Sequence, residues 1–154
     1  MMLKPKFLLD ENLNRLAKWL RMLGYDAAVY KSINIHNKIR LVNRERRIYL
    51  TRDKTLAKKK EKFTMVLIKS EKHLEQLKEI LDYISYNEEF VFTRCIDCNR
   101  ILYDISKGKI KELIPPFVLE NHSHFKVCRK CGKVFWMGTH YQEMKKELKN
   151  ILTI

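Results

Sequence analysis

The first 88 residues alternate short apolar runs with amphipathic stretches. Short apolar runs are typical of strands that are buried on both faces of a sheet, and they occur at residues 6–10, 27–30, 47–51 and 63–68. Apolar residues at helical spacing fall between or after them, over residues 13–23, 35–42 and 74–84. This alternation predicts the α/β class, with a mainly parallel sheet flanked by helices.

Two of the predicted helices carry further signals. Residues 13–23 place four leucines at helical spacing before Gly24, a common stop signal. The cationic residues of this helix lie on another face and are Arg15, Lys18 and Arg21. Ser70 precedes the helix at 74–84 and is a candidate for its N-cap. The first helix is therefore expected to be amphipathic, with a basic side.

The pattern changes near residue 89. Residues 86–89 form a polar link, and beyond them short strand-like pieces surround two cysteine pairs. Pro115 and Pro116 break the pattern, and residues 141–151 predict a closing helix. We therefore expect two units, a larger domain at residues 1–88 and a small module at residues 89–154.

The four cysteines form two Cys-x-x-Cys pairs with 29 residues between them. Each pair places two thiolates on a tight turn, and two such turns can close a tetrahedral site for a structural zinc ion. The proposed ligands are Cys95, Cys98, Cys128 and Cys131. Four unrelated free cysteines and a redox dithiol are the alternatives, but a repeated pair is typical of a metal site. The spacing predicts a ribbon-type module whose metal supports the fold.

The positive charge is large and local. The net charge is +14, and residues 1–60 hold 16 Lys and Arg against 5 acidic residues, whereas the remainder holds 16 against 13. Such a field attracts polyanions, and nucleic acid is the usual partner; a surface that only confers solubility is the alternative. No apolar run is long enough to span a bilayer, and the first residues lack an export signal. We therefore expect a cytoplasmic protein without a membrane partner.

Three carboxylates follow predicted strands. Asp10 and Glu11 come after the first strand and Asp53 after the third. Because ligands of parallel sheets bind beyond the carboxyl ends of the strands, these acids are candidates to hold Mg²⁺ or Mn²⁺, which can activate water against a phosphodiester. Arg52 and Lys54 are candidates to hold phosphate. Helix capping by Asp10 and Asp53 remains the alternative.

Several motifs together resemble a known family. They are Phe7-Leu8-Leu9-Asp10, the run from Leu16 to Asp26, Leu50-Thr51-Arg52-Asp53, the two cysteine pairs, and the run from Val134 to His140. This combination is similar to the Mut-seven C-terminal RNase domain family over nearly the whole chain. The resemblance implies a PIN-like nuclease fold with an appended zinc ribbon, and a metal-dependent ribonuclease whose acids include Asp10 and Asp53.

The chain departs from the family pattern at three places. Members usually have further acids before the third strand and just after the Thr-Arg-Asp motif, where this chain has residues 34–37, which contain no acid, and Lys54-Thr55. Glu11 stands where many relatives have an uncharged residue. With Asp10, Glu11 and Asp53 alone, a single catalytic ion is easier to accommodate than two.

Three functions remain open on the sequence. The first is an endoribonuclease with Asp10, Asp53 and Glu11 as catalytic residues, and with substrate contacts from Arg52, Lys54, Arg15, Lys18 and Arg21. The second is an inactive RNA-binding or ribosome-associated protein that also uses residues 58–60, Arg129, Lys130 and Lys133. The third is a scaffold whose ribbon contacts another protein. RNA is the expected partner, with tRNA, rRNA and the ribosome as candidates.

Overall fold

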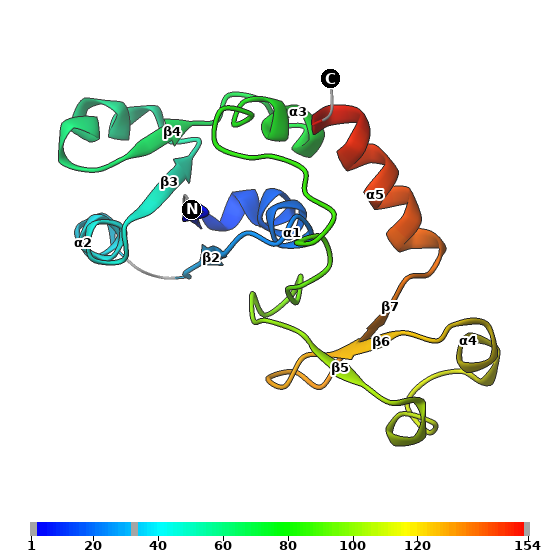
Figure 1. Cartoon of the computed structure of the whole chain (residues 1–154). Helices are drawn as coiled ribbons and strands as arrows, with labels where there is room; N and C mark the ends of the chain where they lie inside the picture. The colour runs from blue at the N-terminus through cyan, green and yellow to red at the C-terminus, as the bar shows by residue number, and fades with distance from the viewer. Residues whose placement is uncertain (1–2, 32–33, 153–154) are drawn as a thin grey trace.

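A four-stranded parallel sheet organises the first part of the chain. The computed structural model describes residues 3–31 and 34–152, with Lys60 described by its backbone alone, so the ends of the two expected units, 1–2 and 153–154, lie outside it. The strands are β1 (Lys6–Leu9), β2 (Ala27–Val29), β3 (Arg47–Thr51) and β4 (Met65–Leu67), in the order β2-β1-β3-β4 (Figure 1). This arrangement confirms the predicted α/β class with its parallel sheet.

Helices cover both faces of this sheet. Side chains of β1 alternate between the faces, because Phe7 and Leu9 join one buried cluster and Leu8 joins another. The first cluster contains the apolar faces of α1 (Asn14–Met22) and α3 (His73–Lys78), and the second contains Val42 of α2 (Ile35–Glu45). Two short 3₁₀ helices, η1 (Glu11–Leu13) and η2 (Lys54–Lys62), follow β1 and β3. A strand with two buried faces explains the short continuous apolar runs in the sequence.

The helix after β4 is shorter than its leucine spacing predicts. α3 begins after Lys72 and ends at Lys78, with turns after it, and the Ser70 side chain is not its N-cap. The Glu79 carboxylate instead accepts hydrogen bonds from the backbone amides of Lys69 and Ser70, both at 2.8 Å. This side chain ties the end of the helix to the segment before it.

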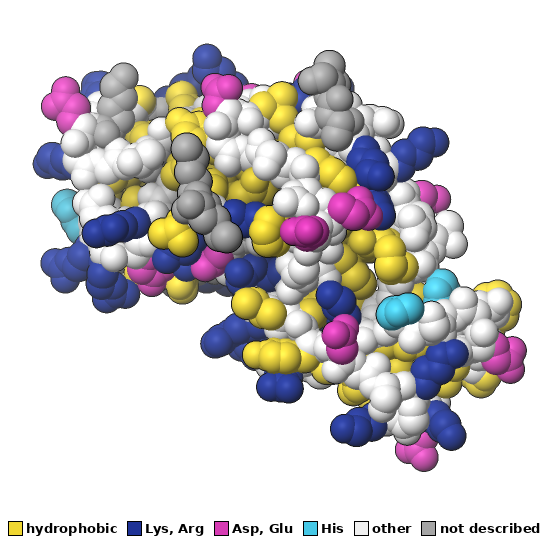
Figure 2. All heavy atoms as spheres, in the orientation of Figure 1, with side chains coloured by type: hydrophobic (Ala, Val, Ile, Leu, Met, Phe, Trp, Pro, Cys, Tyr) yellow, Lys and Arg dark blue, Asp and Glu magenta, His cyan; other side chains and the backbone are white. Residues whose placement is uncertain are grey.

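The second unit is a small antiparallel sheet. Its strands are β5 (Tyr103–Ile105), β6 (Phe125–Val127) and β7 (Val134–Trp136), in the order β5-β6-β7. The connection from β5 to β6 carries η3 (Lys107–Lys109) and α4 (Pro116–Asn121), and it packs Ile110 and Ile114 against Phe125. Pro116 opens α4, since proline is tolerated at the start of a helix. Figure 2 shows this unit as a separate lobe.

The C-terminal helix returns to the first unit. α5 (Thr139–Leu152) runs back toward α3 (Figure 1), and its Tyr141 and Leu148 are buried in the same cluster as α1 and α3. An ion pair between Lys145 and Glu88 holds it there as well. The boundary at residues 88 and 89 stays a prediction, and α5 packs with the core that precedes it. No helix in the described ranges has the length and apolar character needed to cross a membrane.

The turn that carries the first cysteine pair docks on β2. Arg21 is buried and donates hydrogen bonds to the carbonyl oxygens of Ala27 at 2.9 Å and Ile96 at 2.7 Å. Asn99 has a φ of 62°, accepts from the backbone amide of Ala27 at 3.0 Å and donates to Asp26 at 2.7 Å. Helix α1, strand β2 and this turn are therefore joined by buried polar contacts.

Candidate metal centre and acidic cleft

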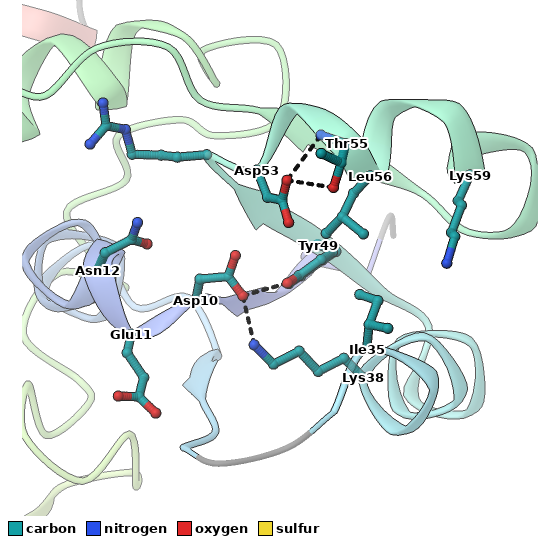
Figure 3. Close-up of a pocket in the computed structure, with 11 residues that line it drawn as sticks. Asp10, Glu11, Asn12, Ile35, Lys38, Tyr49, Asp53, Thr55, Leu56 and Lys59 are labelled. Carbon is teal, nitrogen blue, oxygen red and sulfur yellow. Dashed lines mark hydrogen bonds and ion pairs between the residues drawn. The ribbon is translucent and has the colours of Figure 1, made fainter.

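A cleft of about 740 Å³ lies at the carboxyl ends of β1 and β3. It is lined by Asp10, Glu11, Asn12, Ile35, Lys38, Tyr49, Arg52, Asp53, Thr55, Leu56 and Lys59 (Figure 3). The parallel register brings the ends of the two strands together, since Leu9 lies opposite Leu50. The fold thus places the three predicted acids in one cleft, as expected for a parallel sheet.

Asp10 is held by three side chains of the protein. Its Oδ1 accepts from Lys38 Nζ at 2.8 Å and from the Tyr49 hydroxyl, and its Oδ2 accepts from Thr51 Oγ1 at 2.5 Å. Burial, together with the hydrogen bond to Asp10, raises the pKa of Tyr49 above its ordinary value, so this phenol stays protonated at neutral pH. The Asp10 carboxylate is therefore fixed in position and already paired with a cation.

Asp53 is in a different environment, because it is exposed to solvent. Its Oδ1 accepts from the backbone amide of Thr55 at 2.9 Å and from Thr55 Oγ1 at 2.7 Å, and these bonds lower the pKa of Asp53. Asp53 is the N-cap of η2, whereas the Asp10 side chain makes no such cap for η1. Helix capping, the alternative role for these two acids, is therefore observed for the side chain of Asp53 and not for that of Asp10.

Glu11 is exposed on the rim of the cleft, and Figure 3 shows its carboxylate directed away from Asp10 and Asp53. Within residues 3–31 and 34–152, the three acids do not form a ready cluster of ligand atoms of the kind that the cysteines form. A cation in this cleft would therefore require a change of the Glu11 rotamer or ligands from water.

The predicted phosphate-binding residues lie at different places. Arg52 lines the cleft, with its guanidinium 3.6 Å from Glu71 and its buried Nε without a hydrogen-bond partner in the described part of the chain. Lys54 is exposed beyond the cleft lining, and Arg15 is exposed on α1. Lys18 pairs with Asp97 at 3.6 Å.

Arg21 differs most from its predicted role. Its side chain is committed to backbone carbonyls between β2 and the first cysteine turn, and it is buried. The regular spacing of cations along α1 placed it on a basic face, but the cysteine turn covers that part of the helix. Arg21 is therefore a structural contact in this fold and is left out of the substrate contacts proposed below.

Three cleft residues were not assigned to the nuclease site by sequence reasoning, although residues 58–60 were expected to bind RNA in the inactive alternative. Lys38, Tyr49 and Lys59 all line the cleft, and Lys38 and Tyr49 contact Asp10 directly. Side chains alternate along β3, so Tyr49 lies on the same face of the sheet as Thr51. This alternation could have identified Tyr49 from the sequence. The position of Lys38 depends on how α2 packs on the sheet, and Lys59 sat in a lysine-rich run without distinguishing features. The side chain of Lys60 in that run lies outside the described residues.

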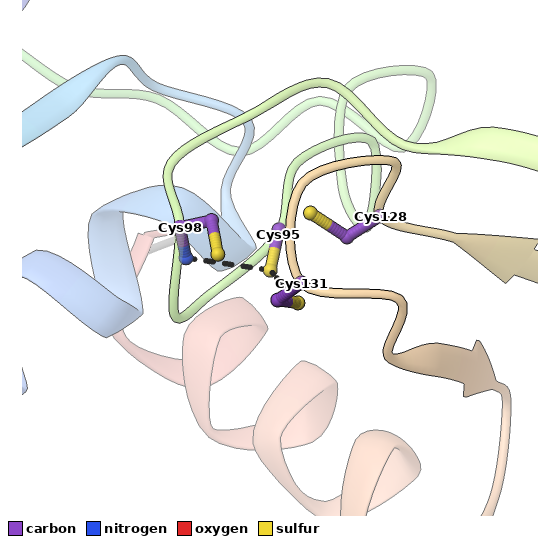
Figure 4. Close-up of side chains that lie close together, drawn as sticks. All are labelled: Cys95, Cys98, Cys128 and Cys131. Atoms are coloured by element: carbon purple, nitrogen blue, oxygen red, sulfur yellow. Dashed lines mark hydrogen bonds between the residues drawn. The ribbon is translucent and has the colours of Figure 1, made fainter.

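The four cysteines converge on one point between the two turns (Figure 4). Their sulfur atoms all lie within 4.8 Å of one another, and the Sγ atoms of Cys95 and Cys131 are 4.0 Å apart. Each turn is closed in the same way. The backbone amide of Cys95 donates to Arg100 O at 2.7 Å, and that of Cys128 donates to Lys133 O at 3.0 Å. The repeated Cys-x-x-Cys spacing therefore produces two matching turns that face each other.

The geometry of the cluster suits a tetrahedral metal. Zinc–sulfur bonds of about 2.3 Å at tetrahedral angles place sulfur atoms about 3.8 Å apart, close to the separation found here. Burial raises the pKa of the Cys95 thiol to about 12, and a bound cation would oppose this by stabilising the thiolate. The histidines at 122, 124 and 140 are not part of the cluster. The four cysteines can thus hold a structural metal such as zinc without an open position.

Comparison with known protein families gives a match over most of the chain. A family model described as the Mut7-C RNAse domain covers residues 5–148 of the 154 residues. Searches of curated proteins and of solved structures returned no match. The matched segment contains the acidic cleft and the four cysteines, and it points to a ribonuclease-like function with RNA as the substrate.

Proposed function

Because the chain belongs to the Mut7-C RNAse domain family, we propose that it is a metal-dependent ribonuclease that hydrolyses RNA phosphodiesters at the acidic cleft. The observation that carries the proposal is the meeting of Asp10 and Asp53 beside Arg52 at the carboxyl ends of neighbouring strands. Carboxylates of this kind, in a chain with a net charge of +14, provide oxygen ligands for a cation within a surface that attracts RNA.

We assign one Mg²⁺ or Mn²⁺ ion to this cleft, with Asp10, Asp53 and Glu11 as its protein ligands. Such an ion activates water and stabilises negative charge on the phosphate when it is bound. A single ion fits the residues better than two, because Lys38 lies 2.8 Å from Asp10 and already supplies one positive charge. Lys38 thus stands on the α2 side of the cleft, near the segment where relatives carry a further acid.

The remaining cleft residues position the substrate. Tyr49 and Thr51 hold the Asp10 carboxylate in one orientation, since each donates a hydrogen bond to a different oxygen. Arg52 has a partly exposed guanidinium that lines the cleft, and Lys59 lines the same cleft. An RNA phosphate bound by either cation would lie in the same cleft as the acids. We therefore keep Arg52 as a substrate contact and add Lys59.

One observation favours an inactive RNA-binding or ribosome-associated protein as the second candidate. Both oxygens of Asp10 are satisfied by protein donors, one of them the ammonium of Lys38. An acid that is neutralised in this way can serve the fold without binding a metal. The two candidates differ in turnover, since only the first predicts cleavage of RNA.

Metal dependence of cleavage is the first test. Zinc-loaded protein is dialysed free of Mg²⁺ and Mn²⁺ and mixed with labelled RNA, and cleavage is expected to appear when either ion is returned. EDTA is avoided because it would also withdraw zinc from the cysteines. Asp53→Asn is expected to slow cleavage by about 10²-fold, whereas the exposed Asp82→Asn leaves the rate unchanged. RNA binding without cleavage under every condition would replace this proposal with the second candidate.

Lys38→Met is expected to strengthen cation binding in the cleft. Removal of an ammonium that lies 2.8 Å from Asp10 removes a competing positive charge, so the Mn²⁺ concentration for half-maximal cleavage should fall by about tenfold. Titration calorimetry with Mn²⁺ measures the same change without cleavage. The exposed Lys69→Met is the matched control. An unchanged or weaker affinity for Mn²⁺ in Lys38→Met would show that Asp10 does not bind the cation.

A further inference from the structure

A basic hollow lies on the lobe that carries the cysteines, apart from the acidic cleft. It has a volume of about 560 Å³ and is lined by Arg94, Asn99, Arg100, Ile101, Tyr103, Arg129 and Lys130. Four of these seven residues are cations and none is acidic. We call this set the ribbon patch. Figure 2 shows Lys and Arg side chains interleaved with hydrophobic ones along the edge of this lobe that borders the first lobe.

Three cations of the ribbon patch, Arg100, Arg129 and Lys130, are exposed to solvent, whereas Arg94 is half-buried and donates a hydrogen bond to Asn99 O at 2.6 Å. Among residues 3–31 and 34–152, no carboxylate lies within ion-pair distance of Arg100, Arg129 or Lys130. The nearby acids are already paired, since Asp97 binds Lys133 at 2.9 Å and Asp26 binds Arg47 at 2.8 Å. The two cysteine turns carry these cations, and Asn99 joins the first turn to Asp26 and Ala27.

The patch also presents an aromatic ring. Tyr103 is 43% exposed, and the Arg129 guanidinium lies 3.6 Å from the centre of its ring. Exposed tyrosine and arginine side chains are the groups on which unstacked bases of single-stranded RNA stack, while neighbouring cations bind the phosphates. The ribbon patch thus combines positive charge, no acidic residue and an exposed aromatic ring. This combination suits single-stranded RNA as the ligand better than the acidic surface of another protein.

A second hollow connects the patch with strand β2. This hollow, about 570 Å³, shares Arg94, Asn99, Arg100 and Lys130 with the first and extends to Val29 and Tyr30. It also contains Asp26 and Asp97, the two acids that are paired with Arg47 and Lys133. Val29 lies opposite Leu9, the residue before Asp10. A strand of RNA in the two hollows would thus follow β2 toward the end of the sheet where the acidic cleft lies.

We propose that the ribbon patch is a second RNA site, which holds single-stranded RNA through phosphate contacts from Arg94, Arg100 and Lys130 and base stacking on Tyr103 and Arg129. The proposal deepens the proposed function and takes from it only that the ligand is RNA. The patch binds RNA outside the acidic cleft, so it selects substrates long enough to reach both places. Cleavage itself does not require the patch.

The test measures binding of a labelled single-stranded RNA of about 12 nucleotides to zinc-loaded, full-length protein without Mg²⁺ or Mn²⁺. The double variant Arg100→Gln with Lys130→Gln is expected to bind at least about tenfold more weakly, and the slope of log affinity against log salt should fall by about 1.4, or about 0.7 for each contact. Lys107→Gln with Lys109→Gln removes the same charge from η3, outside the patch. This control should stay within about twofold of the wild type.

The ring is tested separately from the charge. Tyr103→Ser should weaken binding by about tenfold, whereas Tyr103→Phe, which keeps the ring, should bind as the wild type does. Zinc content is measured for every variant, so that a damaged metal site is not taken for a lost contact. Equal binding by the patch and control double variants would overturn the proposal. Displacement of the RNA by polyglutamate as readily as by unlabelled RNA would also overturn it, since the patch would then accept any polyanion.

The outcome is separable from that of the proposed function. Patch-dependent binding by a protein that never cleaves RNA would leave the ribbon patch in place and remove the nuclease. Metal-dependent cleavage by a protein whose RNA binding does not depend on Arg100 and Lys130 would support the nuclease and remove the ribbon patch as an RNA site.

Discussion

Asp10→Asn is expected to reduce RNA cleavage by at least about 10²–10³-fold. The substitution keeps the shape of the side chain but removes the negative charge that is needed for a cation, and the amide nitrogen would face one of the donors Lys38, Tyr49 and Thr51. The measurement is the initial rate of cleavage at saturating Mn²⁺. Residual activity above a tenth of the wild-type rate would place the reaction elsewhere.

This variant needs a control for stability because Asp10 is largely enclosed. Lys38 loses its ion-pair partner and one hydrogen bond is mismatched, at a cost of about 1–3 kcal/mol in the free energy of unfolding. Thr51→Val removes one bond to Asp10 and one from the backbone amide of Asp53 but leaves both charges, so it reports the cost of misplacing the carboxylates. If thermal unfolding shows that both variants are folded at the assay temperature, a far larger rate loss in Asp10→Asn identifies the charge as the cause.

Cys128→Ser is expected to lower the zinc content from one ion per chain to nearly none and to unfold the second unit. Structural zinc in small modules contributes about 10–16 kcal/mol of apparent binding energy, and the small antiparallel sheet buries few large side chains of its own. Zinc is measured by elemental analysis, and the unfolding by hydrogen exchange of β5, β6 and β7. Exchange should rise throughout these strands and least in β1 and β3.

His140→Ser is the matched control for this prediction. The imidazole of His140 is exposed and outside the cysteine cluster, so zinc content and exchange should stay as in the wild type. Retention of a full zinc equivalent in Cys128→Ser, or loss of it in His140→Ser, would contradict the four-cysteine site. Both variants should be purified under reducing conditions, because thiols without a metal oxidise.

The elements of the sheet were predictable because their signals are local. Short apolar runs bounded by polar residues identified all four strands of the parallel sheet, and the cysteine spacing identified the four-cysteine cluster. Helix ends were less predictable, since the end of α3 depends on a side-chain contact of Glu79 with amides about ten residues away. Periodicity describes one helix at a time and carries no information about such contacts.

The acidic cleft was only partly predictable for a related reason. Strand order explains why Asp10 and Asp53 share a cleft, and this follows from the parallel sheet. Lys38 reaches Asp10 across 28 positions of sequence, and Arg21 reaches Ile96 across 75. Whether a cation on a helix faces solvent, a carboxylate or a neighbouring unit is decided by tertiary packing, so charge patterns alone placed Arg21 with the RNA contacts.

The contact between Asn99 and β2 has a consequence for solubility. β2 is the outermost strand of the parallel sheet, and the amide side chain of Asn99 accepts the hydrogen bond of an outer backbone donor, Ala27. An uncovered sheet edge is a template for strands of other molecules. A metal bound by the four cysteines would hold the turn that carries Asn99, so its withdrawal would expose this edge, and the metal-free protein would then be prone to self-association.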